Sequence, residues 1–102
     1  MAGLVTILNP GETLPAAGHF AGPWRDFART RIAPHARETF AGDGSESAIF
    51  VMSGSATARV GDTDTPLAEG GAVTVGLGSR VDLTAGPDGV ELFITTLTVQ
   101  VD

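Results

Sequence analysis

The 102-residue chain contains no cysteine, and this absence excludes disulfide bonds, thiolate catalysis and sulfur-ligated metal sites. It also lacks lysine: all six basic residues are arginine, against twelve Asp and Glu, which gives a formal net charge of −6. Because nucleic-acid binding depends on clustered Lys and Arg that neutralise phosphates, we expect no nucleic-acid partner.

Long apolar runs and a basic N-terminal segment are missing too. Residues 1–10 read MAGLVTILNP, which lacks the basic and long apolar regions of a signal peptide. No stretch approaches the length of about 20 apolar residues that a membrane span needs. We therefore expect a cytoplasmic protein with no membrane partner.

What the chain does contain is glycine, proline and apolar residues. Fourteen Gly and six Pro indicate many turns, and a hydrophobic fraction of 42% is typical of a folded globule. The length predicts one domain spanning residues 1–102, with an N-terminal arm over 1–25 and a barrel core over 26–101.

The pattern of apolar residues and turn residues predicts an all-β fold of eight or nine short strands. Ser53-Gly54 is typical of a hairpin turn, and Gly86-Pro87-Asp88-Gly89 of a second tight turn. The prolines within residues 12–25 predict irregular structure there. The clearest strands are expected at residues 3–8, 26–32, 36–40, 48–52, 56–60, 72–75, 81–84 and 90–101.

Two segments resemble the conserved motifs of the cupin superfamily, whose first motif reads Gly-x5-His-x-His-x3-Glu-x6-Gly. Residues 45–54 are similar to the strand that ends this motif at Gly54, and residues 69–78 to the opening of the second motif, between Gly70 and Gly78. The resemblance covers roughly residues 26–100. It implies a cupin-type double-stranded β-helix, a jelly-roll barrel with a cavity between two sheets.

The resemblance does not extend to the metal ligands of that family. Aligned on the glycines, its two histidine positions fall on Ala41 and Asp43, its glutamate on Ser47 and the histidine of its second motif on Val81. A transition metal needs three or four imidazole or carboxylate donors, so we expect no metal and no other cofactor. The rival hypothesis is a metal site rebuilt from other residues, such as His19, His35 and Glu91.

Asp43 and His35 are the candidate catalytic residues, because apolar walls raise the pKa of a carboxyl and histidine titrates near neutral pH. The alternatives remain open. Asp43 also suits an Asx-turn within Gly42-Asp43-Gly44, and His35, after Pro34, also suits an exposed turn.

A second set of residues is expected to bind the ligand. Arg37 and Thr39 alternate in step with Ala41 and would face the cavity, unless the strand bends after Pro34 and turns Arg37 to solvent. His19 and Trp24 suit either a lid over the cavity or packing of the N-terminal arm. The complete set is Arg37, Thr39, Ala41, Ser47, Ile49, Val51, Val81, His19 and Trp24.

Phe50 and Met52 alternate with the inward-facing Ile49 and Val51, so they are expected on the outer face of the barrel. Large apolar residues on an outer face often mark an interface, which predicts a homodimer. The rival is that the N-terminal segment covers them within one chain.

Together these observations favour a metal-independent cupin that binds a small organic molecule in its barrel. Isomerisation, cyclisation and dehydration by acid–base residues are the reactions open to it, and whether it is an enzyme stays undecided. The alternative is a non-catalytic dimerising or partner-binding module accessory to a larger enzyme.

Overall fold

The computed structural model describes residues 6–17 and 22–99, which form an antiparallel all-β structure, as predicted. Its strands are β1 (Thr13–Pro15), β2 (Trp24–Ile32), β3 (Arg37–Ala41), β4 (Ser45–Val60), β5 (Thr63–Ala68), β6 (Ala72–Val75) and β7 (Arg80–Thr98). Within these described ranges, no helix is long and apolar enough to cross a membrane.

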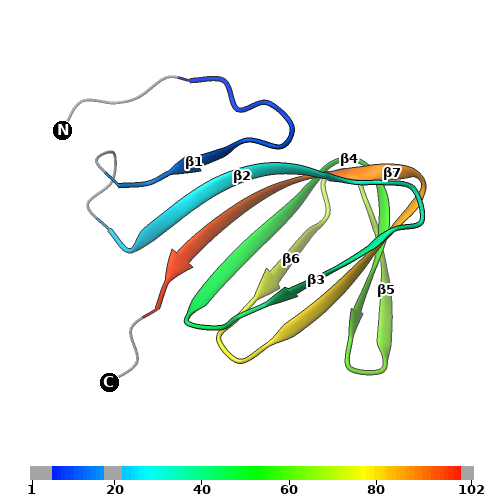
Figure 1. Cartoon of the computed structure of the whole chain (residues 1–102). Coiled ribbons are helices and arrows are strands. Elements are labelled where there is room, and N and C mark those ends of the chain that lie inside the picture. The colour runs from blue at the N-terminus through cyan, green and yellow to red at the C-terminus, as the bar shows by residue number, and fades with distance from the viewer. Residues whose placement is uncertain (1–5, 18–21, 100–102) are drawn as a thin grey trace.

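The long strands β4 and β7 pair along nearly their whole length and take part in two layers (Figure 1). In the first layer, residues 90–97 of β7 and the start of β4 are flanked by β2 and β6, and β1 forms the edge beyond β2. In the second layer, residues 80–85 of β7 and the end of β4 are flanked by β3 and β5. The two layers enclose the core.

Gly54 and Gly89 lie where the chain bends from one layer to the other. The hairpin turn predicted at Ser53-Gly54 and the tight turn predicted at residues 86–89 are both wrong, because β4 and β7 are continuous there. Each glycine has positive φ, 82° and 79°, and Gly54 pairs with Val90 beside a shift in register. Such a β-bulge bends a strand without ending it. A Cβ on Gly54 would lie 2.2 Å from the Gly89 carbonyl oxygen, so glycine is needed there. The same glycines that suggest turns therefore allow two continuous strands to bend together.

The N-terminal part of the chain also differs from expectation. Thr13–Pro15 forms β1 and pairs with β2, although residues 12–25 are predicted to be irregular. Proline has no backbone N–H to donate to a neighbouring strand. Pro15 is tolerated because β1 is an edge strand, in which not every residue has to donate a hydrogen bond. A strand was predicted at residues 3–8. Residues 6–8 do not belong to a strand, and residues 3–5 lie outside the described ranges.

The core lies between the layers and contains aliphatic residues from both. Val51 and Leu92 of the first layer and Ala58 and Leu83 of the second belong to one buried cluster. Phe40, Leu67, Val73 and Ile94 pack against it and are only half-buried. Burial of this aliphatic surface is the main source of stability for a chain without disulfides.

Candidate functional site

Three polar residues form a row across the inner face of the first layer. Asp26 on β2 pairs with Thr96 on β7, Thr96 pairs with Ser47 on β4, and Ser47 pairs with Val75 on β6. Paired residues project to the same face of a sheet, and Val75 belongs to the core. Asp26, Thr96 and Ser47 therefore point between the layers.

This row, at one end of the interior, combines buried and partly exposed side chains. Thr96 and Val75 are buried, as is Ser45 beyond the row, whereas Ser47 and Asp26 are only half-buried. Ser47 and Asp26 are therefore the members of the row that solvent reaches. We call Asp26, Ser47 and Thr96 the barrel mouth.

Hydroxyl groups and one carboxylate supply the polar chemistry of the barrel mouth. The Ser47 and Thr96 hydroxyl oxygens lie 3.2 Å apart and share a hydrogen bond. The Asp26 carboxylate pairs with the Arg25 guanidinium at 3.3 Å, and Arg25 is largely exposed. Ser45, two residues before Ser47, adds a third hydroxyl on the same face, and its side chain is buried. Both hydroxyls of the row are thus held in place while the carboxylate stays accessible to water.

The second layer contributes apolar side chains to the end of the interior that contains the barrel mouth. Phe40 on β3 pairs with the buried Val81 on β7, and both contact the core cluster that contains Val75. β3 ends against the turn that follows β6, where the Gly78 amide donates to the Gly42 carbonyl. Phe40 and Val81 therefore lie at the same end of the interior as the barrel mouth.

The expected orientation of Arg37, Thr39 and Ala41 is wrong. They pair with Thr84, Asp82 and Arg80, which alternate with the buried core residues of β7, and all three are exposed. A shift of one residue turns every side chain of a strand to the opposite face of the sheet. The alignment on the glycines therefore assigned the inner and outer faces of β3 the wrong way round. The residues of β3 that share the core-facing side of β7 are Glu38 and Phe40.

Asp43 and His35 are not brought together. They flank opposite ends of β3, both are exposed, and eight residues of extended chain span roughly 26 Å. His35 occupies a turn with φ 64°, and its amide donates to the Gly86 carbonyl at 3.3 Å. This geometry places each residue in a turn and gives no support to a shared acid–base site.

The remaining predicted residues divide between the core and the outer face. Ser47 faces inward, Ile49, Val51 and Val81 are buried in the core, and contact of these residues with a ligand stays a prediction. Trp24 lies on the outer face of β2, opposite Leu97. His19 lies outside the described residues.

The inward residues do not suit a metal ion of the kind that cupins carry. Phe40 and Val81 have no donor atom, and the Ser47 hydroxyl is a weak ligand. In residues 6–17 and 22–99, no three His, Cys, Asp or Glu side chains are grouped to hold a metal. Of the residues considered for a rebuilt site, Glu91 instead forms an ion pair with Arg29.

A pocket lies on the outer face of the second layer, with a volume of about 290 Å³. It contains Arg37, for which the sequence left both an inward and a solvent-facing orientation open, next to groups of both charges. Thr39 neighbours it and donates a hydrogen bond to Asp82 at 2.6 Å. The residues lining this outer pocket are Arg37, Thr57, Arg59, Asp64, Asp82 and Thr84.

The Thr39 hydrogen bond is the main reason that the pKa of Asp82 lies below its ordinary value; Arg80 and Arg37 lower it further. A carboxyl with a lowered pKa in the folded state contributes stability above its unfolded pKa, and this contribution is lost as pH falls through the folded pKa. We expect Thr39→Val to raise the Asp82 pKa, measured by carboxyl ¹³C NMR titration. Thr57→Val, in the same pocket, is the control, and an unchanged Asp82 pKa in Thr39→Val would contradict the assignment.

No family model matches the sequence, and no curated protein matches it. Solved structures do match. A Cupin 2 conserved barrel domain protein from Salinispora arenicola is 17% identical over 86% of this chain and 74% of that chain, with a TM-score of 0.72. A predicted oxalate decarboxylase from Thermotoga maritima is 15% identical over 76% and 69%, with a TM-score of 0.68.

A cupin protein from Bacteroides fragilis is 10% identical over 76% of this chain and 68% of that chain, with a TM-score of 0.64. These likenesses confirm the cupin fold that the sequence predicted. At such identities they establish the fold alone, so any function has to be argued from the side chains.

Proposed function

We propose that this cupin-fold protein binds a small organic molecule at the barrel mouth. The observation that carries the proposal is the row of Asp26, Thr96 and Ser47 on the inner face of the first layer, where the half-exposed Asp26 and Ser47 lie beside the buried aliphatic core. Ligand sites in proteins commonly combine apolar walls with a few placed polar groups.

The polar groups of the barrel mouth restrict the class of ligand. A carboxylate only accepts hydrogen bonds, whereas a hydroxyl both donates and accepts. Asp26 is the one charged group in the row, and the chain as a whole carries a net charge of −6. A neutral or cationic ligand with an apolar body and an amine or hydroxyl group therefore suits the barrel mouth better than an anion.

Binding, rather than a reaction, is what this arrangement supports. Asp26 is the one acid–base group of the row, and Asp43 and His35 lie elsewhere. Many acid–base mechanisms place a general acid and a general base in one site. The isomerase, cyclase or lyase activity that the sequence left open would require a further acid–base group from the ligand itself.

Benzylamine, benzyl alcohol and benzoate test this proposal, because they share one apolar body and differ in the polar group. In ¹H–¹⁵N NMR titrations, we expect the amine and the alcohol to shift the amide signals of Asp26, Ser47 and Thr96. Benzoate is expected to leave them unchanged. Asp26→Asn should weaken benzylamine binding at least about tenfold, since a hydrogen bond to a charged group is lost.

Thr57→Val, in the outer pocket, is the matched control and should bind all three probes as the parent chain does. Ser47→Ala should reduce binding of the alcohol. Shifts confined to other residues, tighter binding of benzoate than of benzylamine, or no shift with any probe would each refute the proposal.

A further inference from the structure

The outer pocket lies over two neighbouring rows of polar side chains. On this face of the second layer the strands follow the order β3-β7-β4-β5, and paired residues project to the same side of the sheet. The first row is Arg37, Thr84 and Thr57, and the second is Thr39, Asp82, Arg59 and Asp64.

Two short side chains form the floor of the outer pocket. Thr57 and Thr84 are paired on the two central strands, whereas the longer Arg37 and Arg59 stand beside them and form part of the rim. The volume of about 290 Å³ lies at the lower limit of the range for small-molecule sites, about 300–1,000 Å³. A ligand of this pocket is therefore small.

The charges of the outer pocket are paired unevenly. Arg59 lies 3.8 Å from Asp64, and Asp82 lies 3.7 Å from Arg80. Within the part of the chain that the structure describes, the guanidinium of Arg37 takes part in no ion pair. The β3 side of the pocket thus offers a free cation, and the β5 side offers a carboxylate with a single basic partner.

This distribution of charge disfavours a ligand of one sign. A simple anion that binds Arg37 also meets the carboxylates of Asp64 and Asp82, on a chain of net charge −6. A simple cation meets two guanidinium groups. A zwitterion avoids both conflicts, because its carboxylate binds the free guanidinium and its ammonium binds a carboxylate.

The distance across the pocket favours a zwitterion with separated charges. Arg37 on β3 and Asp64 on β5 lie on opposite sides of the paired strands β7 and β4. Three strand spacings place their backbones roughly 14 Å apart. A short carbon chain between carboxylate and ammonium suits this distance better than an α-amino acid, whose charges are adjacent.

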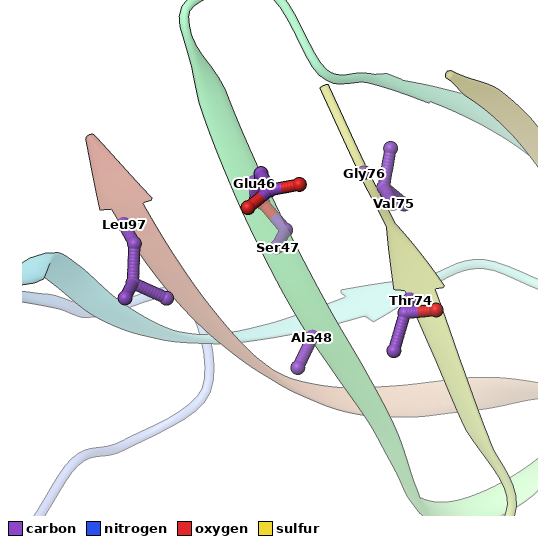
Figure 2. A pocket seen from close by; sticks show the side chains of 7 residues that line it. All are labelled: Glu46, Ser47, Ala48, Thr74, Val75, Gly76 and Leu97. Atoms are coloured by element: carbon purple, nitrogen blue, oxygen red, sulfur yellow. The ribbon is translucent and has the colours of Figure 1, made fainter. Parts of the chain in front are cut away.

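A hollow in the first layer lacks this pattern of charge. It has a volume of about 300 Å³ and lies between β4, β6 and the end of β7 (Figure 2). Glu46 is the one charged side chain among the described residues that line it, and its carboxylate accepts a hydrogen bond from the Leu77 amide at 3.0 Å. No guanidinium is present there to bind the carboxylate of a zwitterion. Charge, and not size, therefore distinguishes the outer pocket.

We propose that the outer pocket binds a small zwitterion, a molecule whose carboxylate and ammonium groups are joined by a short carbon chain. Its carboxylate binds the guanidinium of Arg37 and the hydroxyl of Thr84, and its ammonium binds Asp64. This site is separate from the barrel mouth, which lies on the inner face of the first layer and takes a neutral or cationic ligand.

Three probes with one five-carbon chain test the proposal: 5-aminovalerate, valerate and pentylamine. In ¹H–¹⁵N NMR titrations of the full chain, we expect 5-aminovalerate to shift the amide signals of Arg37, Thr57 and Asp64. Valerate and pentylamine should bind there at least about tenfold more weakly, since each lacks one charge-assisted contact. The Thr96 amide reports separately on any binding of pentylamine at the barrel mouth.

Single substitutions separate the two ends of the ligand. Arg37→Gln should raise the dissociation constant of 5-aminovalerate at least about tenfold, and Asp64→Asn should weaken 5-aminovalerate but not valerate. Both side chains are exposed, so neither change is expected to disturb the fold. Glu46→Gln, in the first-layer hollow, is the matched control and should bind 5-aminovalerate as the parent chain does.

Four results would overturn the proposal: no shift of the outer-pocket amides with 5-aminovalerate, equally tight binding of valerate or pentylamine there, unchanged affinity in Arg37→Gln, or loss of binding in Glu46→Gln. None of them bears on the barrel mouth, because its own test relies on Asp26 and on the benzyl probes.

Discussion

Replacing Gly54 with alanine is expected to destabilise the protein by more than about 4 kcal/mol, the range in which a single substitution removes much of a domain's stability. Two causes add. Gly54 has φ 82°, which an alanine adopts only at a cost, and its Cβ would lie 2.2 Å from the Gly89 carbonyl oxygen. Because Gly89 belongs to the paired β7, relief of the overlap requires the two bends to separate.

Urea unfolding measures the effect, and Gly61→Ala is its control. Gly61 also has positive φ, 59°, but no atom lies within 4 Å of a Cβ built there. It should therefore show the conformational cost alone, about 1–2 kcal/mol. Equal losses in the two variants would mean that β4 and β7 do not approach closely at the bend.

Leu92→Ala is expected to lower the free energy of unfolding by about 2–5 kcal/mol. Leu92 is 0% exposed, in the part of the inner face farthest from the barrel mouth, and belongs to the cluster that joins both layers. Its truncation removes buried apolar surface and leaves a cavity that the flanking strands cannot fill.

The control for this substitution is Leu77→Ala, since Leu77 is 42% exposed in the turn before β7. Its replacement should change the free energy of unfolding by less than about 0.5 kcal/mol. A small loss for Leu92→Ala, measured by the same urea unfolding, would show that the interior is open at that end. The site would then extend much deeper than the barrel mouth.

Local sequence patterns correctly predicted the orientation of β4. The alternation of Ile49 and Val51 with Phe50 and Met52 assigns two residues to the core and two to the outer face, as the structure has them. This succeeds because successive side chains of a strand point to opposite faces, whatever the rest of the fold does. Strand and turn patterns of this kind were enough to predict an all-β chain, whereas the cupin fold was implied by the resemblance to that family's motifs.

The orientation of β3 was decided by tertiary pairing. Nothing within residues 36–41 fixes which face is inner, and the register with β7 turns Phe40 to the core and Arg37, Thr39 and Ala41 outward. Asp26 was missed for a related reason: its place in the barrel mouth depends on pairing with Thr96, seventy residues later in the chain.

The sequence by itself determined the all-β character, the absence of cysteine chemistry and the acidic charge, because each follows from composition or from neighbours along the chain. The tertiary structure alone decided that Gly54 and Gly89 bend two continuous strands and do not end them. A glycine allows both outcomes, and only the opposite strand, through its hydrogen bonds and its close approach, selects between a turn and a bulge.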